Sequence, residues 1–368
     1  MKRKLVFRAV TVILLILFFP IMPVRGAEPD DALGELAENM PDDVISALPD
    51  GAAEDILSGG DGKLKPGFFL TLIGDALRNA LRGMIIFFSS VAAMLILSSL
   101  LSAVGSSAGK DLEKICRFVG GGCVTVTVLN GLIPIKTLAS DTLFGMGLVV
   151  KSSLPVMTFL CASAGEVSRA AADSMWLGAF LTVTEELAEV VLSPLASILF
   201  GFAAATEFSS FSGSPDLSGV SGGVKRTFIF LLSLSAASLT TVMAFQNAVA
   251  KRSDAVVLRT VRFASANLIP VVGGALGEAA GNYLAGLSLI KSSAGTFVTV
   301  CIIVYLIPAF AKLLSYRFVL SVLSAAAGIF GCAPEAAFLR ECGEALGFLL
   351  ALVAICGAVF IISIAIII

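Results

Sequence analysis

Apolar residues recur along this 368-residue chain in runs of about twenty, separated by short polar segments. An α-helix needs about twenty apolar residues to cross the hydrocarbon core of a bilayer. A lipid-exposed backbone must satisfy its own hydrogen bonds, and no ten-residue alternating pattern typical of membrane barrels occurs. The pattern therefore predicts an all-α, polytopic transmembrane protein. The predicted spans are approximately 83–104, 118–135, 142–164, 178–205, 226–249, 263–281, 284–311, 318–333 and 345–368.

The number of spans is expected to lie between seven and nine. Gly, Pro and acidic residues interrupt the apolar pattern at 165–190 and 263–283, which makes these two regions the hardest to divide. Residues 68–82 combine apolar positions at helical spacing with Asp75, Arg78 and Arg82, which predicts an amphipathic interfacial helix before the first span.

The N-terminus has the pattern of a cleavable signal peptide at 1–26. Lys2, Arg3 and Lys4 precede an apolar stretch at 9–19, and small residues lead to a predicted cleavage after Gly26. An uncleaved signal anchor is the alternative.

An acidic segment follows at 27–66, where eleven acids face two bases. Its short apolar patterns are broken by Pro41 and Pro49, which predicts brief amphipathic helices without a core of their own. The segment is expected to be exported, as a solvated spacer or as a surface that docks on a partner. The remaining chain is divided into a first transmembrane half, 67–225, and a second, 226–368.

Basic residues predict the orientation of the spans. With an exported N-terminus, the Gly/Ser-rich loop 206–224 is expected outside and three basic loops inside. These loops carry Lys110, Lys114 and Arg117, then Lys251, Arg252, Arg259 and Arg262, then Lys312 and Arg317.

Two short motifs indicate a parallel internal repeat. A Leu-Ile-Pro sequence at 132–134 and 268–270 is followed in each half by Lys-Ser-Ser, beginning at Lys151 and Lys291. Chance similarity between apolar words is the alternative. Each lysine sits within an apolar run, where a charge is costly and is expected to face protein or water. The hypothesis is that the two lysines line a substrate or ion pathway. The alternative is that each lysine pairs with an acid or snorkels to an interface.

Further candidate residues lie in the two interrupted regions. Glu185 and Glu189 share a helix face and either pair with the lysines or belong to an interfacial helix. Pro270 and Gly273 predict a broken or re-entrant helix at 267–283, followed by Glu278 and Asn282. Close helix packing through small residues explains a glycine such as Gly273 equally well.

Composition limits the kinds of catalytic and metal-binding site that the chain can form. The chain has no histidine, which excludes imidazole bases, Ser/His/Asp triads and histidine metal ligands. The seven cysteines form no CxxC pair, and we expect them to be buried apolar groups. The Gly-Ser-Ser-Ala-Gly-Lys-Asp sequence at 105–111 departs from a nucleotide-binding loop in spacing and in its last residue. No enzymatic activity, cofactor, metal or nucleic acid is expected, and an intramembrane enzyme is disfavoured.

The region 246–295 resembles the stage III sporulation protein AE family of endospore-forming Firmicutes. The resemblance rests on Asp-Ala-Val-Val-Leu-Arg-Thr-Val-Arg-Phe at 254–263, Asn-Leu-Ile-Pro-Val-Val-Gly at 267–273 and Leu-Ser-Leu-Ile-Lys at 287–291. The signal peptide, acidic segment and apolar C-terminus extend it over most of the chain. Gln246-Asn247 departs from the Gln-Gly that the family tends to have.

The resemblance implies a multi-pass protein of the mother-cell membrane around the forespore, with its N-terminal segment extracytoplasmic. It also implies a complex with the other stage III A operon proteins, opposite the forespore protein Q, and assembly by a membrane insertase. We therefore expect a scaffold or conduit subunit of a sporulation transport complex. An autonomous secondary transporter is the alternative, favoured by the repeat, the lysines and the interrupted helix.

Overall fold

A computed structural model describes residues 29–48, 52–57, 66–163, 193–212, 219–231 and 273–367, together with a few single residues between 178 and 237. These ranges are helical and contain no strand, which confirms the predicted all-α class. The signal peptide and the basic loop at 251–262 lie outside them. The helices are α2 (Pro29–Glu38), α3 (Asp42–Ala47), α4 (Ala52–Leu57), α5 (Pro66–Ala108), α6 (Lys110–Ser163), α8 (Ser193–Ser212), α10 (Gly273–Ile329) and α11 (Ala333–Ile367), with a further helical stretch at 219–231.

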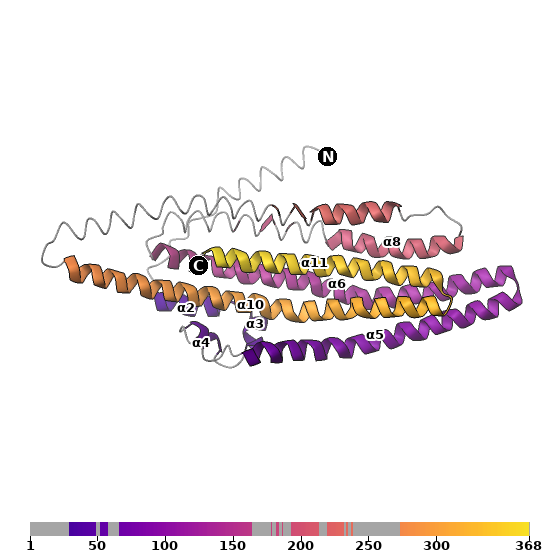
Figure 1. Ribbon diagram of the computed structural model, residues 1–368, viewed down its shortest axis with the longest axis horizontal. Helices are drawn as coiled ribbons and strands as arrows, with labels where there is room; N and C mark the ends of the chain where they lie inside the picture. The colour runs from indigo at the N-terminus through magenta and orange to yellow at the C-terminus, as the bar shows by residue number, and fades with distance from the viewer. Residues whose placement is uncertain are drawn as a thin grey trace, which may run out of the picture.

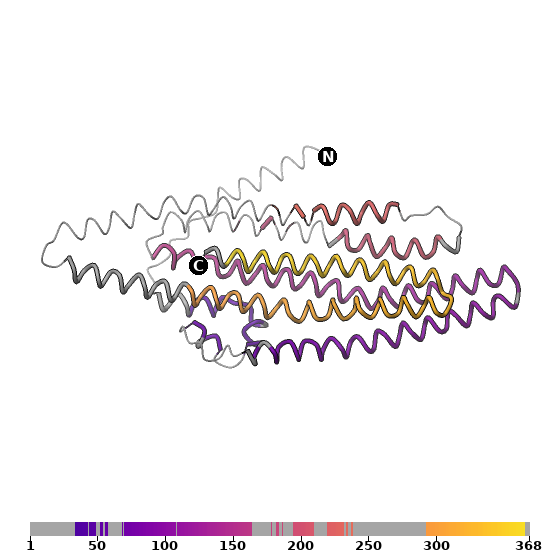
Figure 2. The backbone as a smooth tube through the Cα atoms, viewed as in Figure 1, coloured from indigo at the N-terminus to yellow at the C-terminus, as the bar shows by residue number. Residues whose placement is uncertain are grey.

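The four longest helices form an elongated bundle (Figure 1). α5 and α6 make one antiparallel hairpin and α10 and α11 another, and the two hairpins pack side by side with α8 against α11 and α6. Both hairpin turns, the last residues of α8 and the first residues of the 219–231 helix lie at one end of the bundle, called here the turn end. Ser99 of α5 donates to the carbonyl of Phe330 in the α10/α11 turn. The α5/α6 hairpin extends beyond this turn (Figure 2), and its residues 100–119 are called here the α5/α6 arm.

Four described helices, α5, α6, α10 and α11, are long and apolar enough to cross a membrane. They do not follow the predicted divisions. α6 is one 54-residue helix that joins the predicted spans 118–135 and 142–164, and α10 is one 57-residue helix that joins 284–311 and 318–333. The break predicted between 281 and 284 is also absent, because α10 is continuous from Gly273.

A buried stripe with helical spacing explains this continuity. In α6 the stripe passes the predicted loop at 136–141 without a change of period: Leu132, Ile135, Ala139, Thr142, Met146, Val149, Ser153, Val156 and Leu160 are all buried. Positions three or four apart share one helix face, so the charged residues of the predicted loop fall beside the stripe and need no turn. The same holds in α10 around Lys312, from Ala309 to Leu313 and Leu320.

The amphipathic segment 68–82 is likewise part of α5 and not a separate helix. Its small residues Ala76 and Ala80 face the bundle, while Leu70, Ile73 and Leu77 are exposed. The prediction of a two-faced helix is correct. Phe68 and Leu72 pack against the core, but the exposed leucines and Ile73 point away from the protein.

The predicted placement of two loops on opposite sides is wrong. Phe118, beside the basic α5/α6 turn, contacts Phe208 near the end of α8, with the rings tilted and their centroids 5.5 Å apart. The start of the predicted outside loop 206–224 therefore lies at the same end as the predicted inside loop. Joining two spans into α6 removes one crossing, and this brings α8 back to the turn end. The Lys312 and Arg317 region is also no turn, since it lies within α10.

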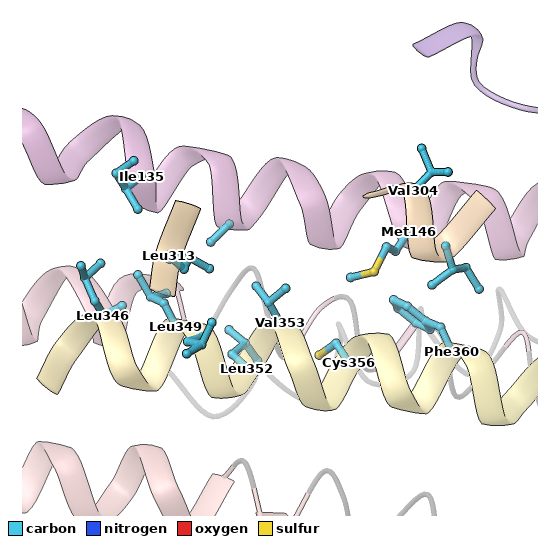
Figure 3. Packing of buried hydrophobic residues seen from close by; sticks show 14 of the residues in the cluster. Ile135, Met146, Val304, Leu313, Leu346, Leu349, Leu352, Val353, Cys356 and Phe360 are labelled. Atoms are coloured by element: carbon cyan, nitrogen blue, oxygen red, sulfur yellow. The ribbon is translucent and has the colours of Figure 1, made fainter. Parts of the chain in front are cut away.

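The core is centred on α11 (Figure 3). Leu349, Val353, Cys356 and Phe360 project from it toward α6 and α10, and each is at most 3% exposed. All seven cysteines are free. Five are buried, as expected for apolar core groups, but Cys116 is half-buried and Cys123 is exposed, so the prediction is wrong for these two.

The acidic segment docks on the chain itself. α2 contacts α6 and α10, and α3 and α4 contact α10. The apolar residues Leu36, Met40, Val44, Leu48 and Ile56 belong to the same core cluster as the long helices. The predicted short amphipathic helices are confirmed, and their missing core is supplied by the bundle.

Two glycines allow the tight turns at the turn end. Gly109, with φ of 125°, separates α5 from α6, and Gly331, with φ of 77°, ends α10. The amide of Gly331 donates to the carbonyl of Gly328 and that of Cys332 to the carbonyl of Ala327, which is the Schellman arrangement for closing a helix.

Gly120 sets the approach of α6 to α5. A Cβ added at Gly120 would lie 2.6 Å from Ser98 Oγ and 3.0 Å from Ser98 Cα. We expect Gly120→Ala to lower the stability of the purified protein by about 1–3 kcal/mol, because α5 must shift. Gly201→Ala, which meets no atom within 4 Å, should be neutral or stabilising. Thermal unfolding midpoints in detergent compare the two, and equal midpoints would contradict the close approach.

Val44 tests the docking of the acidic segment. It is 1% exposed, so Val44→Asp places an unpaired charge in an apolar contact and should cost several kcal/mol of stability. Ala47→Asp, at an exposed position of the same helix, should have little effect. Protein accumulation in membranes and the unfolding midpoint report the difference. If the two variants behave alike, α3 is not part of the folded core.

Candidate polar site at the turn end

The sequence-predicted residues are scattered. Lys151 is exposed on α6, whereas Ser153 of the same motif is buried and donates to the carbonyl of Val150 at 2.7 Å. Gly273 begins α10, and Glu278, Asn282 and Lys291 lie along that helix. Glu185, Glu189 and Pro270 are outside the described residues.

The two Lys-Ser-Ser motifs lie on helices that run in opposite directions, while the second Leu-Ile-Pro motif, at 268–270, is outside the described residues. A Cβ at Gly145 of α6 would meet the ring of Tyr305 of α10. Earlier in α6, residues 133–138 lie beside Lys312 and Tyr316, which come later in α10. α6 and α10 are therefore antiparallel, and the parallel arrangement that the motifs predicted is not seen between them. Ser293, the counterpart of Ser153, is also buried.

The most deeply buried charged groups are two glutamates near the turn end. Glu335 of α11 is 4% exposed and Glu207 of α8 is 2% exposed. Ser98 Oγ of α5 donates to Glu335 Oε1 at 2.8 Å, and Thr125 Oγ1 of α6 donates to Glu207 Oε2. We call these four residues the carboxylate cluster. Its two carboxylates are near enough to interact electrostatically, and it joins four helices.

Local sequence places both glutamates in the core. Glu335 stands in the first turn of α11, where the positive end of the helix dipole favours an acid, and Phe338, Leu339 and Cys342 continue its buried face. In α8 the buried positions Ala196, Phe200, Ala203 and Glu207 follow one another at spacings of three or four. Each glutamate thus occupies a stripe position that the pattern would give to an apolar residue.

An ion-pair triad lies beside the cluster. Lys225 Nζ is 2.5 Å from Glu341 Oε2 and 2.7 Å from Glu344 Oε2, which ties the 219–231 helix to α11. The same two helices are joined by Phe228 and Phe348, whose tilted rings have centroids 5.2 Å apart. Partial burial acts to lower the pKa of the Lys225 ammonium, but the two carboxylates outweigh it and the pKa is raised.

A pocket of about 590 Å³ opens further along the bundle, between α5, α6 and α10. Its polar lining comes from Asn79, Thr137, Asp141, Lys312 and Tyr316. Nearby, Lys136 Nζ donates to Ser197 Oγ at 2.5 Å. The polar residues that interrupt the apolar runs of α5, α6 and α10 therefore meet at one level of the bundle.

The hydrogen bonds of the carboxylate cluster and the ion pairs of Lys225 hold helices together. Hydroxyl donors offset part of the cost of burying each carboxylate, and the interhelical bonds fix the register of α5 and α6 on α11 and α8. Among the described residues there is no group of three His, Cys, Asp or Glu side chains that could bind a metal ion.

Sequence reasoning missed the cluster and the triad, because it assigned Glu207 to the outside loop 206–224 and singled out none of their other acids. The helical spacing in α8 and α11 was the available signal. A glutamate that extends an apolar stripe by three or four residues is a candidate for burial, as Glu207 and Glu335 are.

The family model described as stage III sporulation protein AE matches residues 50–368. The chain belongs to this family, which confirms the resemblance. Neither a curated protein nor a solved structure matches the chain.

Lys225 and Arg226 are adjacent bases with different surroundings. Lys225→Met removes the partner of two carboxylates and should lower stability by about 1–3 kcal/mol. Arg226→Met makes the same charge change at an exposed position and should have little effect. Adding Glu341→Gln and Glu344→Gln to Lys225→Met should restore part of the loss. Unfolding midpoints in detergent measure all three, and a Lys225→Met midpoint equal to that of Arg226→Met would refute the triad.

Proposed function

We propose that this member of the stage III sporulation protein AE family is a non-enzymatic, multi-span membrane subunit of the channel or transport complex linking mother cell and forespore. The family match supports a role in sporulation. Four apolar helices support a place in a membrane. Its site is the mother-cell membrane around the forespore. Its partners are the other stage III A operon proteins and the forespore protein Q complex, and a membrane insertase assembles it.

The observation that carries a subunit role is the uneven covering of apolar surface. In the most apolar window of α5, 22% of the residues are buried, against 56% in α11. The α5/α6 arm also exposes Leu100, Val104 and Ile115 beyond the rest of the bundle. Lipid or a neighbouring subunit must cover such a surface. The chain suits a subunit of a larger assembly, because its core is packed around α11 while α5 presents apolar surface to its surroundings.

The acidic segment supplies the second face. α2–α4 lie away from the turn end (Figure 1), so with Lys110, Lys114 and Arg117 in the cytoplasm they are on the exported side. Their apolar residues are buried, while Glu35, Glu38 and Asp42 are exposed. This acidic surface is available to a partner between the two membranes.

Purification from sporulating cells tests the proposal. A tagged chain extracted in mild detergent during engulfment should retain the other operon proteins in fixed proportion. The variant Glu35→Gln/Glu38→Gln/Asp42→Asn should recover less of them at unchanged stability, because the three side chains are exposed. Lys110→Gln/Asp111→Asn, at the other end of the bundle, is the matched control and should recover them fully.

A chain that purifies alone and catalyses solute uptake in liposomes would overturn the subunit role and favour an autonomous transporter. Normal spore counts in cells lacking the chain would overturn the role in sporulation.

A further inference from the structure

The apolar stretches of three helices end at one level of the bundle. α5 carries no charged residue from 83 to its end at Ala108, α6 none from 118 to 135 and α10 none from 318 to its end at Ile329. The first charges beyond these stretches, away from the turn end, are Arg82, Lys136 and Arg317. All three are basic.

Contacts between the helices confirm the common level. The rings of Phe87 and Tyr316 lie 5.0 Å apart, and a Cβ at Gly131 would meet the Phe87 ring at 2.4 Å. Phe87, Gly131 and Tyr316 each lie within five residues of their basic residue, which is about one and a half helical turns. The uncharged part of α5 is about 40 Å long, enough for the hydrocarbon core of a bilayer. A basic level at the end of an uncharged stretch of this length suits the headgroups of one leaflet.

A shallow groove of about 520 Å³ runs along the outer face of α5 through this level. Leu77, Leu81, Ile85 and Ile86 line it, and each is between 40% and 64% exposed. Arg78 and Arg82, one helical turn apart, line the same groove and are exposed. Among the described residues, no acid forms an ion pair with either arginine.

We infer that this groove binds an anionic phospholipid, with its phosphate between Arg78 and Arg82 and an acyl chain along Leu81, Ile85 and Ile86. Guanidinium groups donate several hydrogen bonds to one phosphate, and their aliphatic stems pack on apolar surface. The apolar side chains continue from the arginines in the direction of the uncharged stretch, as an acyl chain does from its headgroup. A zwitterionic lipid fits the apolar part but lacks the net negative charge that two arginines favour.

Native mass spectrometry of the full chain in detergent tests this site with dioleoyl phosphatidylglycerol and dioleoyl phosphatidylcholine. The unaltered protein should retain phosphatidylglycerol in preference to phosphatidylcholine. Arg78→Gln/Arg82→Gln should lose that preference by about tenfold or more. Arg78→Lys/Arg82→Lys keeps the charge and should keep part of the preference. Glycerol phosphate, which has no acyl chains, should not displace the lipid.

Lys110→Gln/Lys114→Gln is the matched control, because these exposed bases are also one turn apart but lie at the α5/α6 turn. It should bind phosphatidylglycerol as the unaltered protein does. Equal retention by the Arg78→Gln/Arg82→Gln variant, or equal retention of the two lipids, would overturn the site. The site requires only that α5 is in a membrane, so its failure would leave the role in a sporulation complex untouched.

Discussion

The buried stripe along α6 is the constraint on which the rest of the bundle depends. A 54-residue helix is about 80 Å long, and α6, which contains Pro134 and Pro155, remains one element only if neighbours cover the same face along its whole length. α5 covers that face near the turn end, α11 and α10 cover the middle, and α2 lies against the far part. Close contacts at Gly120, Gly131 and Gly145 bring the neighbours near enough to do so. The antiparallel course of α5, α6, α10 and α11 follows from this shared stripe.

The position of each polar residue relative to such a buried stripe, called here a seam, also decides what that residue does. Lys136 and Asp141 fall beside it, so they can interrupt an apolar run without interrupting the helix, and Lys312 is in the same position on α10. Glu207 and Glu335 fall within a seam, so they are buried and must be satisfied by hydroxyl groups of α6 and α5. Polar residues of the first kind form a pocket and a basic level on the outside of the bundle. Those of the second kind lock helices together on the inside.

This distinction explains how far the sequence could predict the structure. The all-α class, the apolar helices and the amphipathic acidic segment depend on local composition and periodicity, and they were predicted. Helix ends at 136–141 and 312–317 were predicted wrongly, because only the tertiary packing shows that the stripe continues through them. Lys151 was chosen for its apolar neighbours in the chain, yet it stands about 200° around the helix from the buried Ser153. Glu207 and Glu335 were missed because charge alone does not reveal which face they occupy.

The two faces of the bundle then have different requirements. α11 has core contacts with α10, α6 and α8, and its acids Glu341 and Glu344 are held by Lys225, so this side is completed by the chain itself. α5 contributes mainly small residues to the core near its start and turns Ile85, Ile86 and Ile96 outward. Side chains of that size on the outside of a helix add nothing to the internal packing, and they are stable only against lipid or another apolar surface. Within the part of the chain that the structure describes, the bundle is therefore closed on the side of α11 and open on the side of α5, and it is through α5 that lipid or another apolar surface must complete it.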